Sequence, residues 1–157
     1  MSGIDPVPQG HSPLVPTLTL KNASAAIAFY KEAFGATEEL RLAEPSGKVG
    51  HAELRIGGAL VALADEYPDY GCLSPATIGA SPVSFHLYVP DVYAAVARAV
   101  TACATLVRPL RNEFYGDRTA TVADPFGYRW QLSSRIEDVS PGEMQARFER
   151  LMSGRGA

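Results

Sequence analysis

The feature that most constrains the fold is an internal repeat, because the order of elements predicted for the first half of the chain recurs in the second. Each half reads as a strand, a helix and then three further strands. Leu20 aligns with Val89 and Gly58 with Gly127, a spacing of 69 residues in both pairs. The sequence therefore predicts an α+β fold of two tandem βαβββ modules.

Two predicted helices, Ala23–Phe34 and Val92–Ala102, each carry apolar residues on one stripe. Each follows a strand-like run through a short polar turn, in which Asn22 or Asp91 can accept hydrogen bonds from free helix N–H groups. Gly35 ends the first helix. The strand-like runs are Leu14–Leu20, Thr37–Ala43, Val49–Ile56 and Ala59–Ala64 in the first half, and Val83–Val89, Thr105–Leu110, Arg118–Ala123 and Arg129–Ser133 in the second.

These elements divide the chain into two modules and two further segments. Residues 13–66 form the first module and residues 83–138 the second, and an inter-module loop, 67–82, joins them. A polar C-terminal helix is predicted within residues 139–153, because Ser140 opens a capping box with Pro at the first helical position.

Charge and composition exclude several partners. The net charge is −3 and no basic residues cluster, so nucleic acid is not an expected partner. No apolar stretch approaches the roughly 20 residues that span a bilayer, and the first residues lack signal-peptide features, so we expect a cytoplasmic protein without a membrane partner. Cys72 and Cys103 lie far apart and are interpreted as reduced thiols.

Strand alternation sorts the side chains into a face under the helices and an opposite, open face. Trp130, Leu132 and Val83 are predicted to face the helices. His86 is a candidate for direct ligand contact, because an imidazole titrates near neutral pH and can donate or accept. The candidates for ligand contact on the open faces are Thr17, His51, Glu53, Ser84, His86, Tyr88 and Gln131.

An aromatic loop lies between two predicted strands of the second half. Phe114 and Tyr115 precede Gly116, whose lack of a Cβ permits an unusual turn. Aromatic side chains on such a loop can form a lid or a stacking surface for a planar ligand. Asp117 and Arg118, which follow, are interpreted as a structural ion pair.

Four segments of the chain resemble the vicinal oxygen chelate superfamily, of the glyoxalase/bleomycin resistance/dioxygenase type. The combination is most similar to the PhnB-like branch and covers residues 13–138. The resemblance implies that the two modules form half-open β-barrel cups, whose open sheet faces line the ligand site. The four segments are Leu18–Phe34, His51–Gly58, His86–Val92 and Phe114–Trp130.

The resemblance also implies where a metal would bind. Members of this superfamily usually hold a divalent ion with His, Glu or Gln side chains from four strands, and the matching positions here are Val15, Ala62, Ser84 and Gln131. Two of these have no donor atom, whereas tight binding needs at least three good donors, so no cofactor is predicted. The alternative is a relocated Ni²⁺, Zn²⁺, Mn²⁺ or Fe²⁺ site at His51, Glu53 and His86.

Three functions remain open at this stage. The first is a small-molecule binding protein without an essential metal, which sequesters or transforms a small, partly planar organic compound. The second is a divalent-metal-dependent lyase, isomerase or dioxygenase, and the third is a structural or regulatory dimer with a vestigial cup. Because chains of this superfamily commonly pair about a two-fold axis, we expect a homodimer.

Overall fold

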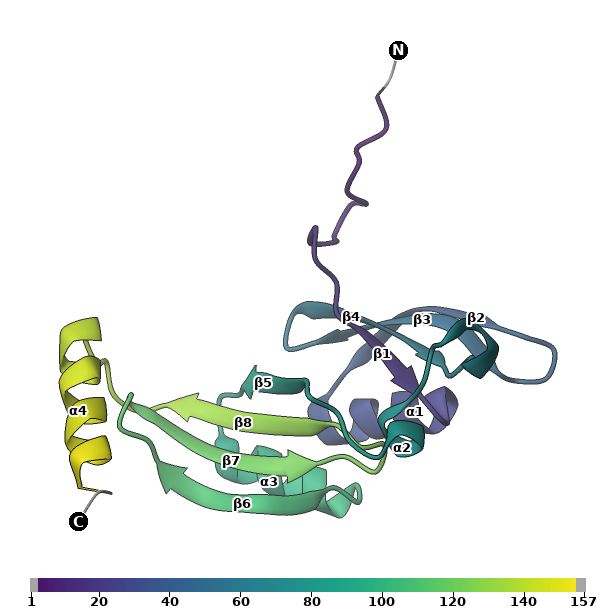
Figure 1. Cartoon of the computed structure of the whole chain (residues 1–157). Coiled ribbons are helices and arrows are strands. Elements are labelled where there is room, and N and C mark those ends of the chain that lie inside the picture. Colours follow the sequence, from purple (N-terminus) through teal and green to yellow (C-terminus); the bar gives the residue numbers. More distant parts are fainter. Residues whose placement is uncertain (1–2, 155–157) are drawn as a thin grey trace.

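The computed structural model describes residues 3–154 and contains the predicted repeat (Figure 1). The first module consists of β1 (Thr17–Leu20), α1 (Ala23–Phe34), β2 (Thr37–Ala43), β3 (Val49–Ile56) and β4 (Ala59–Asp65). The second consists of β5 (Ser84–Tyr88), α3 (Val92–Thr101), β6 (Thr105–Asn112), β7 (Asp117–Ala123) and β8 (Arg129–Arg135). The remaining elements are the 3₁₀-helix η1 (Pro68–Tyr70), α2 (Pro75–Ile78) and α4 (Pro141–Ser153).

The two modules have the same sheet topology. The strand order is β1-β4-β3-β2 in the first sheet and β5-β8-β7-β6 in the second. In each sheet the first strand pairs in parallel with the last strand of its module, and the other pairs are antiparallel. The α+β fold of two βαβββ modules is thus confirmed, and the described strands form two open sheets rather than a closed barrel.

The helices begin where the sequence places short polar side chains. Asn22 accepts a hydrogen bond from the backbone N–H of Ala25 at 3.0 Å, and Gly35 ends α1 with φ of 67°. Asp91 starts α3, and Ser140 starts α4, by equivalent side-chain bonds to backbone N–H groups. Local chemistry therefore fixes where these helices begin.

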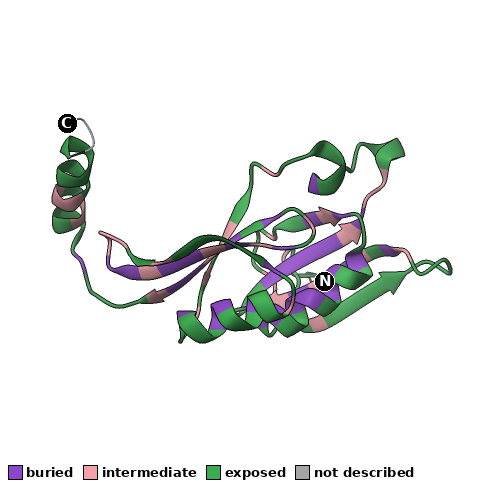
Figure 2. Ribbon diagram, turned by 90° about the horizontal axis from the view of Figure 1, so that it is seen from below, coloured by how far each residue is buried: buried purple, intermediate pink, exposed green. Residues whose placement is uncertain are grey.

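The helix-side faces of the two sheets share one core. α1 and α3 pack against each other. Trp130 is 2% exposed, and its ring centroid lies 4.6 Å from that of Phe34 on α1, so its predicted burial is confirmed. Buried residues line the central strands in Figure 2, whereas α4 has none.

A buried carboxylate joins the modules within this core. Asp124, in the turn between β7 and β8, is 5% exposed and accepts hydrogen bonds from the Tyr30 hydroxyl at 2.7 Å and from Trp130 Nε1 at 3.0 Å. Its other oxygen accepts from the backbone N–H groups of Phe126 and Tyr128. Burial, together with the Asp124 charge, raises the pKa of Tyr30.

Two local predictions are wrong. Val83 does not face a helix: it precedes β5 and is 56% exposed. Asp117 and Arg118 do not pair with each other, since successive strand residues point to opposite faces. The Asp117 carboxylate accepts from the Tyr88 hydroxyl, and Arg118 donates to Asn112.

The inter-module loop and β6 also differ from the expected pattern. Residues 67–82 contain η1 and α2, each of which ends at a glycine with positive φ. β6 extends two residues further than predicted and contains two register shifts. Within the described residues, no helix is long and apolar enough to span a membrane.

Candidate functional site

The open face of the second sheet carries two rows of polar side chains. Residues that are directly opposite each other on paired strands point to the same face, so the strand register defines each row. One row runs from β5 to β6 through His86, Gln131, Thr121 and Arg108. The next runs through Tyr88, Ser133, Thr119 and Arg111.

The arginine end of both rows depends on irregularities in β6. Register shifts occur between Leu106 and Arg108 and between Arg108 and Arg111. Simple alternation would place Arg108 and Arg111 on opposite faces, because they are three residues apart. The shifts bring both guanidinium groups to the open face.

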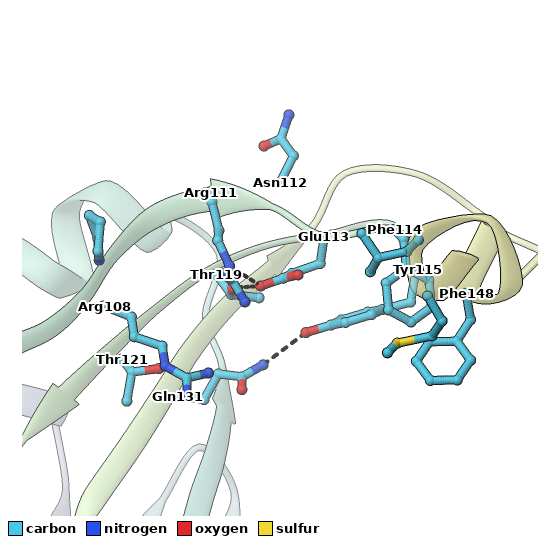
Figure 3. A pocket seen from close by; sticks show the side chains of 13 residues that line it. Arg108, Arg111, Asn112, Glu113, Phe114, Tyr115, Thr119, Thr121, Gln131 and Phe148 are labelled. Carbon is cyan, nitrogen blue, oxygen red and sulfur yellow. Dashed lines mark hydrogen bonds and ion pairs between the residues drawn. The ribbon is translucent and has the colours of Figure 1, made fainter. Parts of the chain in front are cut away.

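A cavity of about 580 Å³ lies at this end of the rows (Figure 3). The sheet contributes its polar floor, the aromatic loop forms one end, and α4 supplies an apolar wall. The residues that define these parts are Arg108, Thr121 and Gln131 of the floor, Phe114 and Tyr115 of the loop, and Phe148, Leu151 and Met152 of α4.

Two polar networks organise the cavity. Glu113 accepts from Arg111 Nε at 2.5 Å and from the Thr119 hydroxyl at 3.1 Å, so its carboxylate is already neutralised. Gln131 Nε2 donates to the Tyr115 hydroxyl oxygen at 3.1 Å. Burial raises the pKa of Tyr115, so this hydroxyl keeps its proton at neutral pH and can donate it.

Arg147 holds α4 against the aromatic loop. Its guanidinium donates to the Phe114 carbonyl at 3.2 Å, to Glu137 at 2.7 Å and to Glu143 at 2.8 Å. The Phe114 and Phe148 ring centroids are 5.5 Å apart. The apolar wall of the cavity is therefore positioned by a charged side chain outside it.

Gly116 sets the shape of the loop. Its φ is +97°, and a Cβ at this position would lie 2.5 Å from the Glu137 carbonyl oxygen. That oxygen belongs to the backbone and cannot move aside as a flexible side chain would. A larger residue is therefore excluded unless the loop shifts away from Glu137.

The sequence-predicted residues of the second module fall into two groups. Gln131, Phe114 and Tyr115 line the cavity. Ser84, His86 and Tyr88 lie on β5, at the other end of the rows, and do not line it. His86 Nε2 is 2.7 Å from the Ser133 hydroxyl, and the His86 ring stacks on Tyr88 at 4.5 Å.

The predicted residues of the first module lie on the other sheet. His51 Nε2 is 3.2 Å from Glu53 Oε1, and the same oxygen lies 3.3 Å from His11 Nε2. The hydrogen bond from His51 is the main cause that lowers the pKa of Glu53. Thr17 lies on the open face of β1, opposite Ala62.

The relocated metal site is not supported by this arrangement. His86 is on β5 of the second sheet, whereas His51 and Glu53 are on β3 of the first. No three His, Cys, Asp or Glu side chains within residues 3–154 could hold a metal ion together. At the positions implied by resemblance, Val15 and Ala62 carry only carbon, so that donor set does not fit a divalent ion.

Sequence reasoning missed the arginines, the threonines and the helical wall of the cavity. The register shifts in β6 break the alternation, so it could not predict that Arg108 and Arg111 share the open face. Thr119 and Thr121 belong to no sequence pattern that indicates a binding site. The C-terminal helix was predicted as polar, and the contact of its Phe148 with Phe114 is tertiary.

Comparisons with known families agree with this architecture. Residues 14–132 match the family model described as the Glyoxalase/Bleomycin resistance protein/Dioxygenase superfamily. An uncharacterized protein of Mycobacterium bovis is 43% identical over 136 residues, which are 85% of this chain and 90% of that protein.

Solved structures show the same fold. TioX from Micromonospora sp. ML1 is 26% identical with a TM-score of 0.63, and the match covers 80% of this chain and 99% of TioX. A PhnB protein from Bacillus cereus is 16% identical with a TM-score of 0.61, over 78% of this chain and 99% of that one. At this low identity the second match supports the fold alone.

Proposed function

The chain belongs to the Glyoxalase/Bleomycin resistance protein/Dioxygenase superfamily, and we propose that it binds a small, partly planar organic molecule in the cavity of its second module. The observation that carries the proposal is the cavity itself, about 580 Å³ in volume, where aromatic and polar side chains converge. This volume falls in the range of small-molecule sites.

The aromatic part of the cavity supports a planar ligand. Phe114, Tyr115 and Phe148 come from two separate segments, and their rings stand at different angles to one another. Phe148 is 43% exposed although it is apolar, so a flat ligand against it would remove apolar surface from water. Sequestration and a metal-independent reaction both begin with this binding step.

Phe148→Ala is expected to weaken the binding of 2-naphthol, a neutral planar probe, by about fivefold to tenfold, because a lost aromatic contact costs about 1 kcal/mol. The dissociation constant can be measured by NMR titration of the full chain. Tyr70→Ala is the matched control, since Tyr70 is 84% exposed and lies outside the cavity.

Equal weakening by Phe148→Ala and Tyr70→Ala would contradict the proposed location. If neither 2-naphthol nor any member of a panel of planar compounds binds, the proposal fails and a structural dimer with a vestigial cup is favoured.

Added Ni²⁺, Mn²⁺, Zn²⁺ or Fe²⁺ is expected to leave the melting temperature unchanged, because the family's usual metal positions lack enough donor atoms here. Any ligand that binds only the folded state raises the melting temperature, so thermal unfolding with each ion is a direct measurement. A rise of several degrees with 1:1 stoichiometry would contradict metal-independent function and support a metal-dependent lyase, isomerase or dioxygenase.

A further inference from the structure

The hydrogen-bonding groups that remain free in the cavity are mostly donors. Within residues 3–154, the Arg108 guanidinium has no hydrogen bond or ion pair, although it lines the cavity. Among the same described residues the Thr121 hydroxyl has no hydrogen bond either, and the Tyr115 hydroxyl accepts from Gln131 but keeps its own proton. The free acceptor beside them is the amide oxygen of Gln131, which is neutral.

The single carboxylate that lines the cavity does not balance this charge. Glu113 is already bound by Arg111 and Thr119, and its side chain is 15% exposed. With Arg111 paired to Glu113, Arg108 is left as an uncompensated positive charge. An anionic group next to Arg108 would therefore gain charge-assisted hydrogen bonds without displacing an existing ion pair.

The two ends of the cavity differ in chemistry. Arg108, Thr121 and Gln131 lie together on the sheet, whereas Phe148 lies at the other end beside the aromatic loop (Figure 3). Leu151 and Met152 of α4, which are 40% and 44% exposed, extend the apolar end. A ligand that fills the cavity must be polar and negative at one end and apolar at the other.

We infer that the cavity selects aromatic carboxylates, with the carboxylate on Arg108 and Thr121 and the ring against Phe148. This inference rests on the proposed function and specifies its ligand class. One uncompensated guanidinium matches a monoanion in charge, and its planar fork matches a carboxylate in geometry. The Tyr115 hydroxyl, between the two ends, donates to a polar substituent of the ring.

Three probes with the same naphthalene ring separate the contributions of charge and ring. We expect 2-naphthoate to bind the full chain at least about tenfold more tightly than 2-naphthamide or 2-naphthol, since a hydrogen bond to a charged group contributes 1.5 kcal/mol or more. Arg108→Gln should lower the affinity for 2-naphthoate to about that for 2-naphthol and so remove this preference. Arg108→Lys, which keeps the charge but not the fork, should retain only part of it.

Arg129→Gln is the matched control. Arg129 is exposed on β8 of the same sheet and does not line the cavity, so its loss should leave all three affinities unchanged. If 2-naphthoate and 2-naphthol bind equally and Arg108→Gln changes neither, the carboxylate inference is overturned while the proposed function stands. If no probe binds, both are overturned.

Discussion

Replacing Asp124 with alanine is expected to lower the free energy of unfolding by about 3–5 kcal/mol, because the change leaves several buried hydrogen-bond donors without an acceptor. The Tyr30 hydroxyl, Trp130 Nε1 and two backbone N–H groups lose their acceptor together. Each buried donor without a partner costs about 1–3 kcal/mol, and repacking or water recovers part of the total. Equilibrium unfolding in urea measures the loss.

Asp69→Ala is the control for this experiment. Asp69 belongs to η1, is exposed and makes no side-chain hydrogen bond within the described residues, so its replacement should change stability by less than about 0.5 kcal/mol. A loss below about 1 kcal/mol for Asp124→Ala would show that the carboxylate does not join the modules. Because the hydrogen-bond partners of Asp124 come from both modules, we expect the native protein to unfold in a single transition.

Trp130→Ala is expected to destabilise the protein by about 3–5 kcal/mol through a cavity in the shared core. The Trp130 ring lies 4.6 Å from the ring of Phe34, 4.6 Å from that of Phe85 and 5.4 Å from that of Tyr30. These neighbours belong to both modules, so they cannot close the gap without moving α1 relative to the second sheet. Circular dichroism during urea unfolding gives the stability of the variant.

The native protein allows an independent check of this packing. Trp130 is the single tryptophan of the chain, so the fluorescence of the folded protein reports its surroundings. Blue-shifted emission is expected, and Trp130→Phe should cost less than Trp130→Ala because it leaves a smaller cavity. Red-shifted emission before unfolding would contradict the burial of Trp130.

The repeat and the helices could be predicted because they depend on local signals. Both ends of α1 were predicted at the observed residues, since Asn22 and Gly35 act on backbone groups within one helical turn. The burial of Trp130 and Leu132 also followed from alternation, because β8 is regular over those residues.

The remaining features of the fold and of the site depend on contacts between distant segments or on strand irregularities. Asp124 meets Tyr30 across 94 residues, so the turn sequence alone could not reveal a link between modules. Alternation failed in β6 because each register shift reverses which face a residue occupies. The partnership of Glu53 with His11 required the N-terminal segment to fold back onto β3.

The division of each sheet into a core face and an open face has an evolutionary consequence. Arg108, Thr121 and Gln131 line the cavity and lie outside the shared core, so we expect substitutions there to change the proposed ligand contacts with little effect on stability. Substitutions on the open face can therefore change ligand specificity during evolution while the residues of the core face keep the chain folded. Divergence in this protein should be fastest at the arginine end of the rows and slowest around Asp124.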